Sequence, residues 1–575
     1  LAFHLERLVA DGAHRRVVAM KNILKYSVAA LFGLGIVACT GDFEKMNTSD
    51  VQVNPDDLPL SSQCAEPMQY CYPPQQNMFQ FWTNLTVDFY SGYFMTPNGN
   101  FTNGDMGENR GHSGGMYENH YLHVFNNTRR LIATLDGKNQ PALAGVMRIV
   151  QAYSLMMTTD VYGPLAHSSI LSGEYESYFP FDSQQQLYQT MLDDTQKALD
   201  AFNKPTDDEK AGLGTFDIWC GGDFEMWKKV ANTMRLRIAL RLSKRADEMK
   251  AAGYDLPAIA KAAAGNTLAN GGKDIMIDKS LENELWLMFA WGDCGFNANL
   301  VTLMSGLKDP RQPLYMAKNQ DKFTTSDGKE VAKGTGYYGI RFASGLPGKP
   351  NDWGKLSGWV DGSNSKGIYS APLPIFKQAE SYFLLAEAAL RGWTSGDVKS
   401  LYEEGIRTSM ANELAYKGKY AEIAEYAKGA VEKYISGTDT QIDFVDPFDP
   451  KLNTKALNKL GVKWDNNASN EDKLARIMTQ KYIALFPLST EAWAEQRRTG
   501  YPVLFPAYVN ESNGAVTTEE GVRRQIYSSN AGDTNAEGLK TGIELLNKEN
   551  SSKTGHSGDQ GGTRVWWDNA DKGNF

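Results

Sequence analysis

The chain has 575 residues, of which 42% are hydrophobic and 22% are charged, and its formal net charge is −9. The mean hydropathy is −0.44, and beyond the N-terminal region no apolar run approaches the roughly 20 residues that span a bilayer. An acidic chain is a poor match for the phosphate backbone of nucleic acids, so we expect no nucleic-acid partner.

The N-terminal region carries the pattern of an export signal. A start at Met20 is followed by two lysines and then by twelve uncharged, mostly apolar residues that end at Ala38. A basic segment followed by a short apolar one is typical of a secretory signal and is too short to span a membrane. The tripeptide IVA before Cys39 resembles a bacterial lipobox, which implies that Cys39 becomes the acylated first residue of the mature protein.

We therefore expect residues 1–38 to be an upstream extension plus a lipoprotein signal peptide, and residues 39–575 to form a single body. Asp42 and Glu44 resemble the surface-export signal of Bacteroidota lipoproteins. A multiply acylated cysteine holds a protein to a membrane, so the expected location is the cell-surface side of the outer membrane, with the lipid as a partner. Loss of residues 1–38 removes five basic and two acidic residues and makes the net charge −12.

Four further cysteines follow the lipobox, namely Cys64, Cys71, Cys220 and Cys294. An exported compartment permits a disulfide between the first two, which would be a local constraint. The sequence leaves the pairing open, because connectivity does not follow from spacing alone.

The elements predicted in chain order are mostly helices. Apolar residues at three- and four-residue spacing predict helices over 141–160, 183–202, 224–244, 377–392, 397–410, 471–486 and 489–500. Pro141 at the first start, Asp223 as an N-cap and Gly500 as a stop are typical helix-end signals. Ser489 or Thr490 is expected to cap the last of these helices.

Between the helices lie long stretches rich in Gly, Asn, Asp, Pro and aromatic residues, at 91–119, 290–372 and 500–575. Their aromatic content favours ordered, functional loops over disorder. Strand signals are short, and the clearest is the apolar run at 285–291. The predicted fold is therefore a mostly α-helical scaffold of helix pairs with long ordered loops and a few short strands.

Six motifs occur in an order that resembles the SusD/RagB family of outer-membrane lipoproteins. They are RIVQAYSLMMTTDVYGPLA, WKKVANTMRLRIALRLSK, LKDPRQPLYM, AESYFLLAEAALRGW with YEEGIRTSM, TQKYIALFPLSTEAWAEQRRTGYPVL, and TRVWWD. The resemblance covers about residues 39–575 and implies tetratricopeptide-like helix pairs with an inserted loop-rich ligand-binding region. It also implies capture of glycans or other nutrients, including starch, as the lid of a SusC-like TonB-dependent transporter that serves in polysaccharide utilization.

Most charged residues in these motifs are predicted to serve the scaffold. Asp309 and Arg311 fit a turn braced by an arginine and a carboxylate. Glu380 and Glu387 are suited either to capping or to pairing with neighbouring helices, while Arg497 and Arg498 are suited to binding loop carbonyls or carboxylates.

Ligand binding is expected from loop aromatics, because flat rings stack on the C–H face of a sugar and nearby amides bind its hydroxyls. Two clusters qualify, the first at 81–101 and the second from Trp286 to Trp359. The predicted ligand-binding residues are Trp82, Tyr90, Tyr93, Asn98, Trp286, Trp291, Tyr337, Trp353 and Trp359. If 285–291 is a strand, Trp286 and Trp291 face opposite ways and only one of them meets the ligand.

Three patterns suggest other chemistry and are set aside. Ser113 lies in a GHSGG motif, but no strand precedes it as a nucleophile elbow requires. The GTGYYG motif at 334–339 does not open a helix, and His120 and His123 lack a convincing third metal ligand. We therefore expect no catalytic residue, no metal and no cofactor, and the sequence does not decide whether calcium is bound.

Three classes of function remain open. The preferred one is a transport-associated protein that binds an oligosaccharide, with an oligopeptide as the alternative ligand. A surface glycoside hydrolase needs two carboxylates about 5 to 9.5 Å apart, which sequence alone does not exclude. A surface adhesin would act without any transporter.

Overall fold

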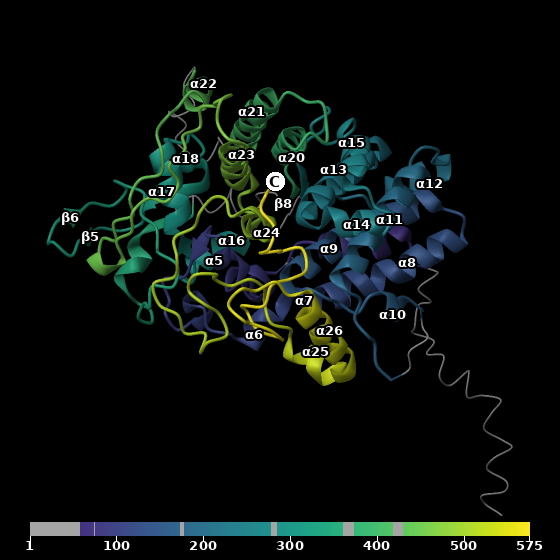
Figure 1. Ribbon diagram of the computed structural model, residues 1–575, viewed down its shortest axis with the longest axis horizontal. Coiled ribbons are helices and arrows are strands. Elements are labelled where there is room, and N and C mark those ends of the chain that lie inside the picture. Colours follow the sequence, from purple (N-terminus) through teal and green to yellow (C-terminus); the bar gives the residue numbers. More distant parts are fainter. Residues whose placement is uncertain (1–57, 74, 173–176, 278–283, 360–372, 418–428) are drawn as a thin grey trace, which may run out of the picture. The chain divides into compact units, whose positions relative to one another are not determined.

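The computed structural model describes residues 58–73, 75–172, 177–277, 284–359, 373–417 and 429–575 (Figure 1). The chain divides into two units, Leu1–Pro59 and Leu60–Phe575, and the fold described below is that of the second. Cys39 and the expected signal peptide lie outside the described residues. No helix among the described residues is both long enough and apolar enough to cross a membrane.

Helices dominate the second unit. The α-helices in chain order are α3 (Leu60–Gln69), α4 (Gln76–Phe79), α5 (Val87–Tyr90), α6 (Arg110–Ser113), α7 (Gly115–Asn119), α8 (Asn126–Gly137), α9 (Pro141–Tyr162), α10 (Ser168–Ser172), α11 (Gln184–Ala201), α12 (Asp207–Leu213), α13 (Phe224–Arg241), α14 (Ala246–Ala251), α15 (Leu256–Ala264), α16 (Glu284–Ala290), α17 (Ala298–Leu307), α18 (Gln312–Tyr315), α20 (Gln378–Leu390), α21 (Val398–Lys417), α22 (Ala430–Ile435), α23 (Asn470–Leu485), α24 (Ser489–Thr499), α25 (Ser529–Thr534) and α26 (Ala536–Glu549).

The strands are short and form two-stranded antiparallel ladders. They are β1 (Phe94–Met95) with β3 (Gly295–Phe296), β2 (Ile275–Ile277) with β8 (Leu373–Phe376), β4 (Met316–Asn319) with β7 (Ser357–Trp359), and β5 (Phe323–Thr324) with β6 (Glu330–Val331). The mostly α-helical fold predicted from the sequence is confirmed.

Consecutive helices pack as pairs. Helix α8 packs on α9, α9 on α11, and α20 on α21, while α13 lies against α11, α15 and α20 (Figure 1). The connections within the α8–α9 and α20–α21 pairs are short, which makes each pair antiparallel. The arrangement is the tetratricopeptide-like scaffold that the family resemblance implied.

The predicted helix ends can be compared with the structure one by one. Helix α9 begins at Pro141, Asp223 caps α13 by accepting a hydrogen bond from Glu225 N (2.8 Å), and Gly500 ends α24 with φ +82°. The predicted cap of α24 is wrong, because Leu488 is the N-cap residue and makes no side-chain cap. The hydroxyl of Ser489 instead donates to the buried carboxylate of Asp88.

The predicted strand at 285–291 is also wrong. Residues 285–290 lie in helix α16, in which Leu285 and Met288 are buried one helical turn apart, and Trp291 follows the helix in a turn. A short apolar run does not by itself distinguish a strand from a partly buried helix, since its periodicity is hidden when every residue is apolar.

The three stretches predicted as loops contain helices as well. Helix α17 lies within 290–372, α25 and α26 lie within 500–575, and the short helices α6 and α7 lie within 91–119. The four cysteines among the described residues are free and buried, so Cys64 and Cys71 form no disulfide.

Buried ion pairs connect the helices of the scaffold. Arg237 of α13 pairs with Glu380 of α20 (2.5 Å), and Arg498 of α24 donates two hydrogen bonds of 2.7 Å to Glu387 of α20. Arg241 contacts Asp160, Glu491 and Glu495 within the same buried region. These contacts confirm the scaffold roles predicted for the charged motif residues.

The loop-facing arginines behave in the same way. Arg311 donates to both carboxylate oxygens of Asp309 (2.9 and 2.6 Å), which is the predicted braced turn. Arg497 donates to the carbonyl oxygens of Arg523 (2.6 Å) and Asp160 (2.8 Å), and so fixes the C-terminal loop against α9.

Candidate functional site

A hollow of about 250 Å³ opens between α16, β7 and the 3₁₀ turn Asp352–Lys355. We call it the tryptophan hollow, because Trp286, Trp353 and Trp359 line it from three different elements. Its remaining lining residues are Pro97, Phe289, Ala290, Gly292, Cys294, Gly295, Gln320, Gly354, Leu356, Ser357 and Gly358.

Local structure brings the three indoles together. Trp286 lies on helix α16, and Trp359 lies on strand β7, where it pairs with Met316 of β4. Asn351 caps the 3₁₀ turn by accepting a hydrogen bond from Trp353 N (3.1 Å), and the third indole, that of Trp353, lines the same hollow. Residues more than sixty positions apart thus share one surface.

The ring of Trp353 is held in place from behind. Its Nε1 donates to the carboxylate of Asp446 (3.1 Å), and its edge meets the ring of Phe448 at a centroid distance of 5.1 Å. Asp446 is 2% exposed and also accepts backbone hydrogen bonds from Phe448 and Asp449 (both 2.9 Å). Burial raises the pKa of the Asp446 carboxyl, although these hydrogen bonds oppose the shift.

Trp359 forms the floor of the hollow. It is 5% exposed and lies against an aromatic cluster, parallel to Phe296 at 6.4 Å and tilted toward Phe289 at 5.8 Å. A floor packed in this way has little freedom to move, so the hollow is pre-formed on this side.

Two neutral polar side chains contribute hydrogen-bonding groups. The hydroxyl of Ser357 accepts from Tyr338 N (2.9 Å), and the amide nitrogen of Gln320 donates to the Lys318 carbonyl (2.6 Å). The side-chain oxygen of Gln320 accepts no hydrogen bond from the part of the chain that the structure describes. Gly358 allows Gln320 to approach, since a Cβ there would lie 2.6 Å from Gln320 Cγ.

The described lining carries no carboxylate, ammonium or guanidinium group. Burial raises the pKa of the Cys294 thiol well above its ordinary value, so this group is neutral as well. Charges lie at the rim, where Lys349 pairs with Asp293 (2.5 Å) and Lys355 with Asp352 (2.6 Å). The arrangement suits binding of a neutral, flat-faced ligand.

Two further predicted residues lie beside the tryptophan hollow. The Asn98 amide donates to Asp293 (3.4 Å), next to the lining residues Gly292 and Cys294. Trp291, which is 38% exposed, follows α16 directly, and its carbonyl oxygen accepts a hydrogen bond from Lys349 (2.7 Å).

The other predicted residues lie elsewhere. Trp82 and Tyr93 have no exposed area, and the Tyr93 hydroxyl donates to the carbonyl of Tyr482 within the core. Tyr90 is half-buried against Trp493, and Tyr337 is half-buried against the main core. We leave these four out of the candidate site.

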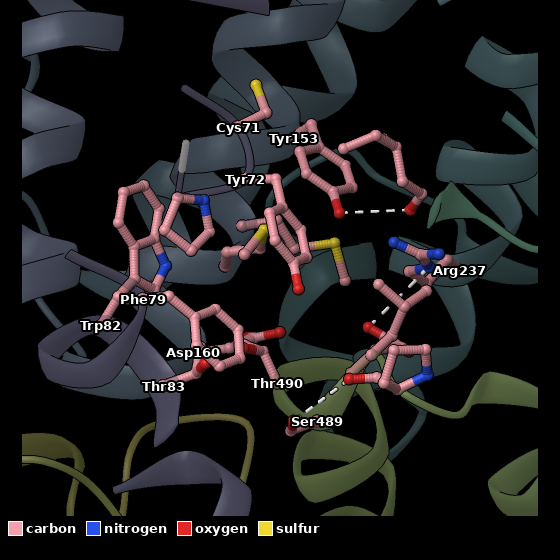
Figure 2. A pocket seen from close by; sticks show the side chains of 17 residues that line it. Cys71, Tyr72, Phe79, Trp82, Thr83, Tyr153, Asp160, Arg237, Ser489 and Thr490 are labelled. Carbon is pink, nitrogen blue, oxygen red and sulfur yellow. Dashed lines mark hydrogen bonds and ion pairs between the residues drawn. The ribbon is translucent and has the colours of Figure 1, made fainter. Parts of the chain in front are cut away.

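A second cavity, shown in Figure 2, is lined by Trp82 among others but has a volume of only about 40 Å³. In Figure 2, Trp82, Phe79 and Thr83 lie on the side opposite Arg237. Its charged groups already have partners, since Arg237 lies 3.8 Å from Glu491 and Asp160 is paired with Arg241. The volume suits a few water molecules and is too small for a sugar ring.

A third, shallower hollow of about 690 Å³ lies beside α15 and the connection between α20 and α21. Trp393 is its single aromatic residue, and most of the remaining lining is small. It therefore lacks the several converging rings that the tryptophan hollow offers.

The structure separates the residues of the alternative motifs. Ser113 ends the short helix α6, and the described residues directly before this helix, 106–109, form no strand, so the nucleophile elbow is not formed. His120 Nδ1 lies 2.6 Å from the Thr158 hydroxyl, whereas His123 pairs with Glu66 (2.7 Å). Among the described residues no group of three or more His, Cys, Asp or Glu side chains is placed to hold a metal ion.

Sequence reasoning missed Phe289, Gln320, Ser357 and the positioning residue Asp446. Phe289 was missed because the strand prediction for 285–291 considered only Trp286 and Trp291 as ligand-binding residues. The other three enter through pairings between distant segments, β4 with β7 and Trp353 with Asp446. No local pattern in the sequence signals these pairings.

With this geometry in hand, the chain can be compared with known proteins. The family model described as SusD-like, Susd and RagB outer membrane lipoprotein, matches residues 42–568. The chain therefore belongs to the SusD-like family of outer-membrane lipoproteins. No curated protein matches the chain.

Solved structures agree with this assignment. A chitin-binding SusD homologue from Flavobacterium johnsoniae is 28% identical, with a TM-score of 0.75, and the match covers 90% of this chain and 100% of that one. A SusD homologue from Bacteroides vulgatus is 26% identical (TM-score 0.74; 90% and 98% covered). A third, from Bacteroides thetaiotaomicron, is 27% identical (TM-score 0.70; 89% and 99% covered).

Proposed function

We propose that this protein binds a glycan in the tryptophan hollow and delivers it, uncleaved, to a SusC-like TonB-dependent transporter. In this proposal it acts as a cell-surface lipoprotein anchored through acylated Cys39. The observation that carries the proposal is the convergence of Trp286, Trp353 and Trp359 on one pre-formed hollow of about 250 Å³.

The hollow has the chemistry that a sugar requires. A pyranose offers an apolar C–H face, which stacks on an indole, and a rim of hydroxyls, which exchange hydrogen bonds with neutral polar groups. The indoles supply the stacking faces, while Gln320 and Ser357 supply the polar groups. Trp353 is pre-oriented by Asp446, so less conformational entropy is lost when a ligand binds.

The same lining argues for capture over hydrolysis. A glycoside hydrolase places two carboxyl groups about 5 to 9.5 Å apart across the scissile bond. The described lining of the tryptophan hollow contains no carboxyl group. We therefore favour a binding protein over the surface glycoside hydrolase.

Oligomers of N-acetylglucosamine are the first ligands to test, because the similar structure from Flavobacterium johnsoniae is described as chitin-binding. The full-length chain carrying Cys39→Ala, which removes the lipid, is titrated by calorimetry with these oligomers, with starch and cellulose oligomers, and with peptides. We expect one glycan class to bind without product formation.

Two tryptophan variants test whether the ligand binds in the tryptophan hollow. We expect Trp353→Ala to weaken binding by about five- to 150-fold, since stacking on one ring is worth about 1 to 3 kcal/mol. Trp393→Ala removes an indole from the shallow hollow beside α15 and serves as the matched control, with unchanged affinity expected. Binding of peptides alone would move the protein to oligopeptide uptake, and release of shortened sugars would identify an enzyme.

Anchoring and delivery are tested in cells. Cys39→Ala is expected to move the protein from the membrane fraction to the soluble fraction. A tagged wild-type chain is expected to co-purify with a TonB-dependent transporter from outer membranes. Uptake that is unchanged when the transporter is deleted would favour the adhesin alternative.

A further inference from the structure

Two lysines stand at the rim of the tryptophan hollow, and each is bound to an aspartate of this chain. We propose that the tryptophan hollow selects neutral glycans over acidic ones and that Asp293 sets this selectivity by neutralising Lys349. The inference rests on the proposed function, because it concerns the ligand class of the same site.

The lining provides the first argument. It contains aromatic, aliphatic, glycine, amide, hydroxyl and thiol groups, and none of the described lining residues is charged. A uronate or sulfate that entered would lose water without gaining a counter-charge, which is strongly unfavourable. A neutral sugar loses only hydroxyl hydration, which Gln320 and Ser357 are placed to replace.

Lys349 would reverse this preference if it were free. Its Nζ donates to Asp293 Oδ1 (2.5 Å) and to the carbonyl oxygen of Trp291 (2.7 Å). Gly292 and Cys294, the chain neighbours of Asp293, both line the hollow, so the ammonium group stands at its edge. The carboxylate of Asp293 therefore neutralises the ammonium group of Lys349, which would otherwise be available to pair with an acidic sugar.

Asp293 is itself held in position from the other side. Gln80 Nε2 donates to its Oδ2 (3.2 Å) and Asn98 Nδ2 donates to its Oδ1 (3.4 Å). The side chain of Asp293 is 12% exposed, against 39% for Lys349. The aspartate is thus a fixed part of the rim, whereas the lysine is the more exposed partner.

Two further features act in the same direction. Lys355, between the lining residues Gly354 and Leu356, donates to Asp352 (2.6 Å), which compensates the second cation. The whole chain carries a formal net charge of −9, so its long-range field repels anions as they approach.

The test uses matched pairs of ligands that differ only in charge. These are oligomers of N-acetylglucosamine, glucose and mannose, and the same oligomers with the C6 hydroxymethyl group oxidised to a carboxylate. Calorimetry with the full-length Cys39→Ala chain measures both members of each pair. We expect the neutral member of the bound pair to bind at least about tenfold more tightly than its oxidised form.

Asp293→Asn keeps the shape of the rim and removes the charge that neutralises Lys349. It also loses one of the two amide hydrogen bonds, because the new NH2 group cannot accept from Gln80 or Asn98. We expect this variant to bind the oxidised oligomer several-fold more tightly than the parent does, with affinity falling as salt rises. Adding Lys349→Met should remove the gain. Asp207→Asn, which frees Lys210 on the remote helix α12, is the matched control and should leave the ratio unchanged.

The outcomes separate the two proposals. If the parent binds oxidised oligomers as tightly as neutral ones, or if Asp293→Asn leaves the ratio unchanged, the selectivity inference is wrong while glycan binding stands. If neither member of any pair binds, the proposed function fails and this inference fails with it.

Discussion

The indole of Trp353 shows how much of the candidate site depends on one side chain and its support. One edge of the ring is fixed by a hydrogen bond to Asp446 and by contact with Phe448, while the ring lines the tryptophan hollow. A ring fixed in this way presents its face to a ligand with little further loss of side-chain conformational entropy.

Asp446→Ala tests this support without touching the hollow. We expect sugar affinity to fall about fivefold, because Trp353 loses a hydrogen bond that contributes about 1 kcal/mol to its orientation. Calorimetry measures the affinity, and thermal unfolding shows whether the variant is folded. An unchanged affinity in a folded variant would mean that Phe448 alone positions the ring.

Arg498 and Glu387 form one of the most buried ion pairs of the scaffold, with no exposed side-chain area on either residue. Burial alone would raise the pKa of Glu387, but Arg498 and Arg391 outweigh it, so the pKa is lowered from its ordinary 4.5. A carboxyl group whose pKa is lower in the folded than in the unfolded state stabilises the fold at any pH above its unfolded-state pKa. This contribution is lost as the pH falls toward the folded-state pKa.

Arg498→Met is therefore expected to reduce the free energy of unfolding at pH 7 by about 3 to 5 kcal/mol. The difference from the wild type should shrink as the pH falls below about 4.5. Denaturant unfolding at several pH values measures both effects. Arg407→Met, at the exposed pair with Glu432, is the control and should change stability little; an equal loss there would refute the burial argument.

At the scale of elements, helix ends are where sequence and structure agree most closely. Pro141 starts α9, Asp223 caps α13 and Gly500 ends α24, as their chemistry indicates. These signals act through the backbone of a few neighbouring residues and do not depend on the rest of the fold.

Gly500 provides a test at this scale. Its φ is +82° and nothing lies within 4 Å of where a Cβ would stand, so Gly500→Ala isolates the cost of the left-handed backbone. We expect a loss of about 1 kcal/mol in the free energy of unfolding. Gly137→Ala at the end of α8, where φ is outside the left-handed range and the space is also open, should be neutral or stabilising. Equal effects at the two sites would contradict this explanation.

Some helices were not predicted from the sequence, and the structure explains why. Helix α26 contains Gly538 and Gly542, which are typical of loops, but here each glycine permits a close approach. A Cβ at Gly538 would lie 2.1 Å from the Phe179 carbonyl, and one at Gly542 would lie 2.4 Å from the Phe181 ring. Helix α16 is apolar apart from Glu284, which hides its periodicity.

At the scale of the whole molecule, the helical scaffold could be predicted because its helices have strong apolar periodicity and their motifs keep the family order. The candidate site could be predicted only in part. Trp286, Trp353 and Trp359 come from the aromatic stretches that the sequence indicated, but their convergence depends on the β4–β7 pairing and on the capped turn at 352–355. Such long-range pairings leave no local signal, which is also why Trp82 and Tyr93 could not be recognised as core residues.

The measurement that tests the account most directly is a crystal structure of the protein with its bound oligosaccharide. We predict that a sugar ring lies against the face of Trp353 or Trp286 within the tryptophan hollow, with hydroxyls in reach of Gln320 or Ser357. A sugar bound at another surface, such as the hollow beside Trp393, with the tryptophan hollow empty, would contradict the central claim.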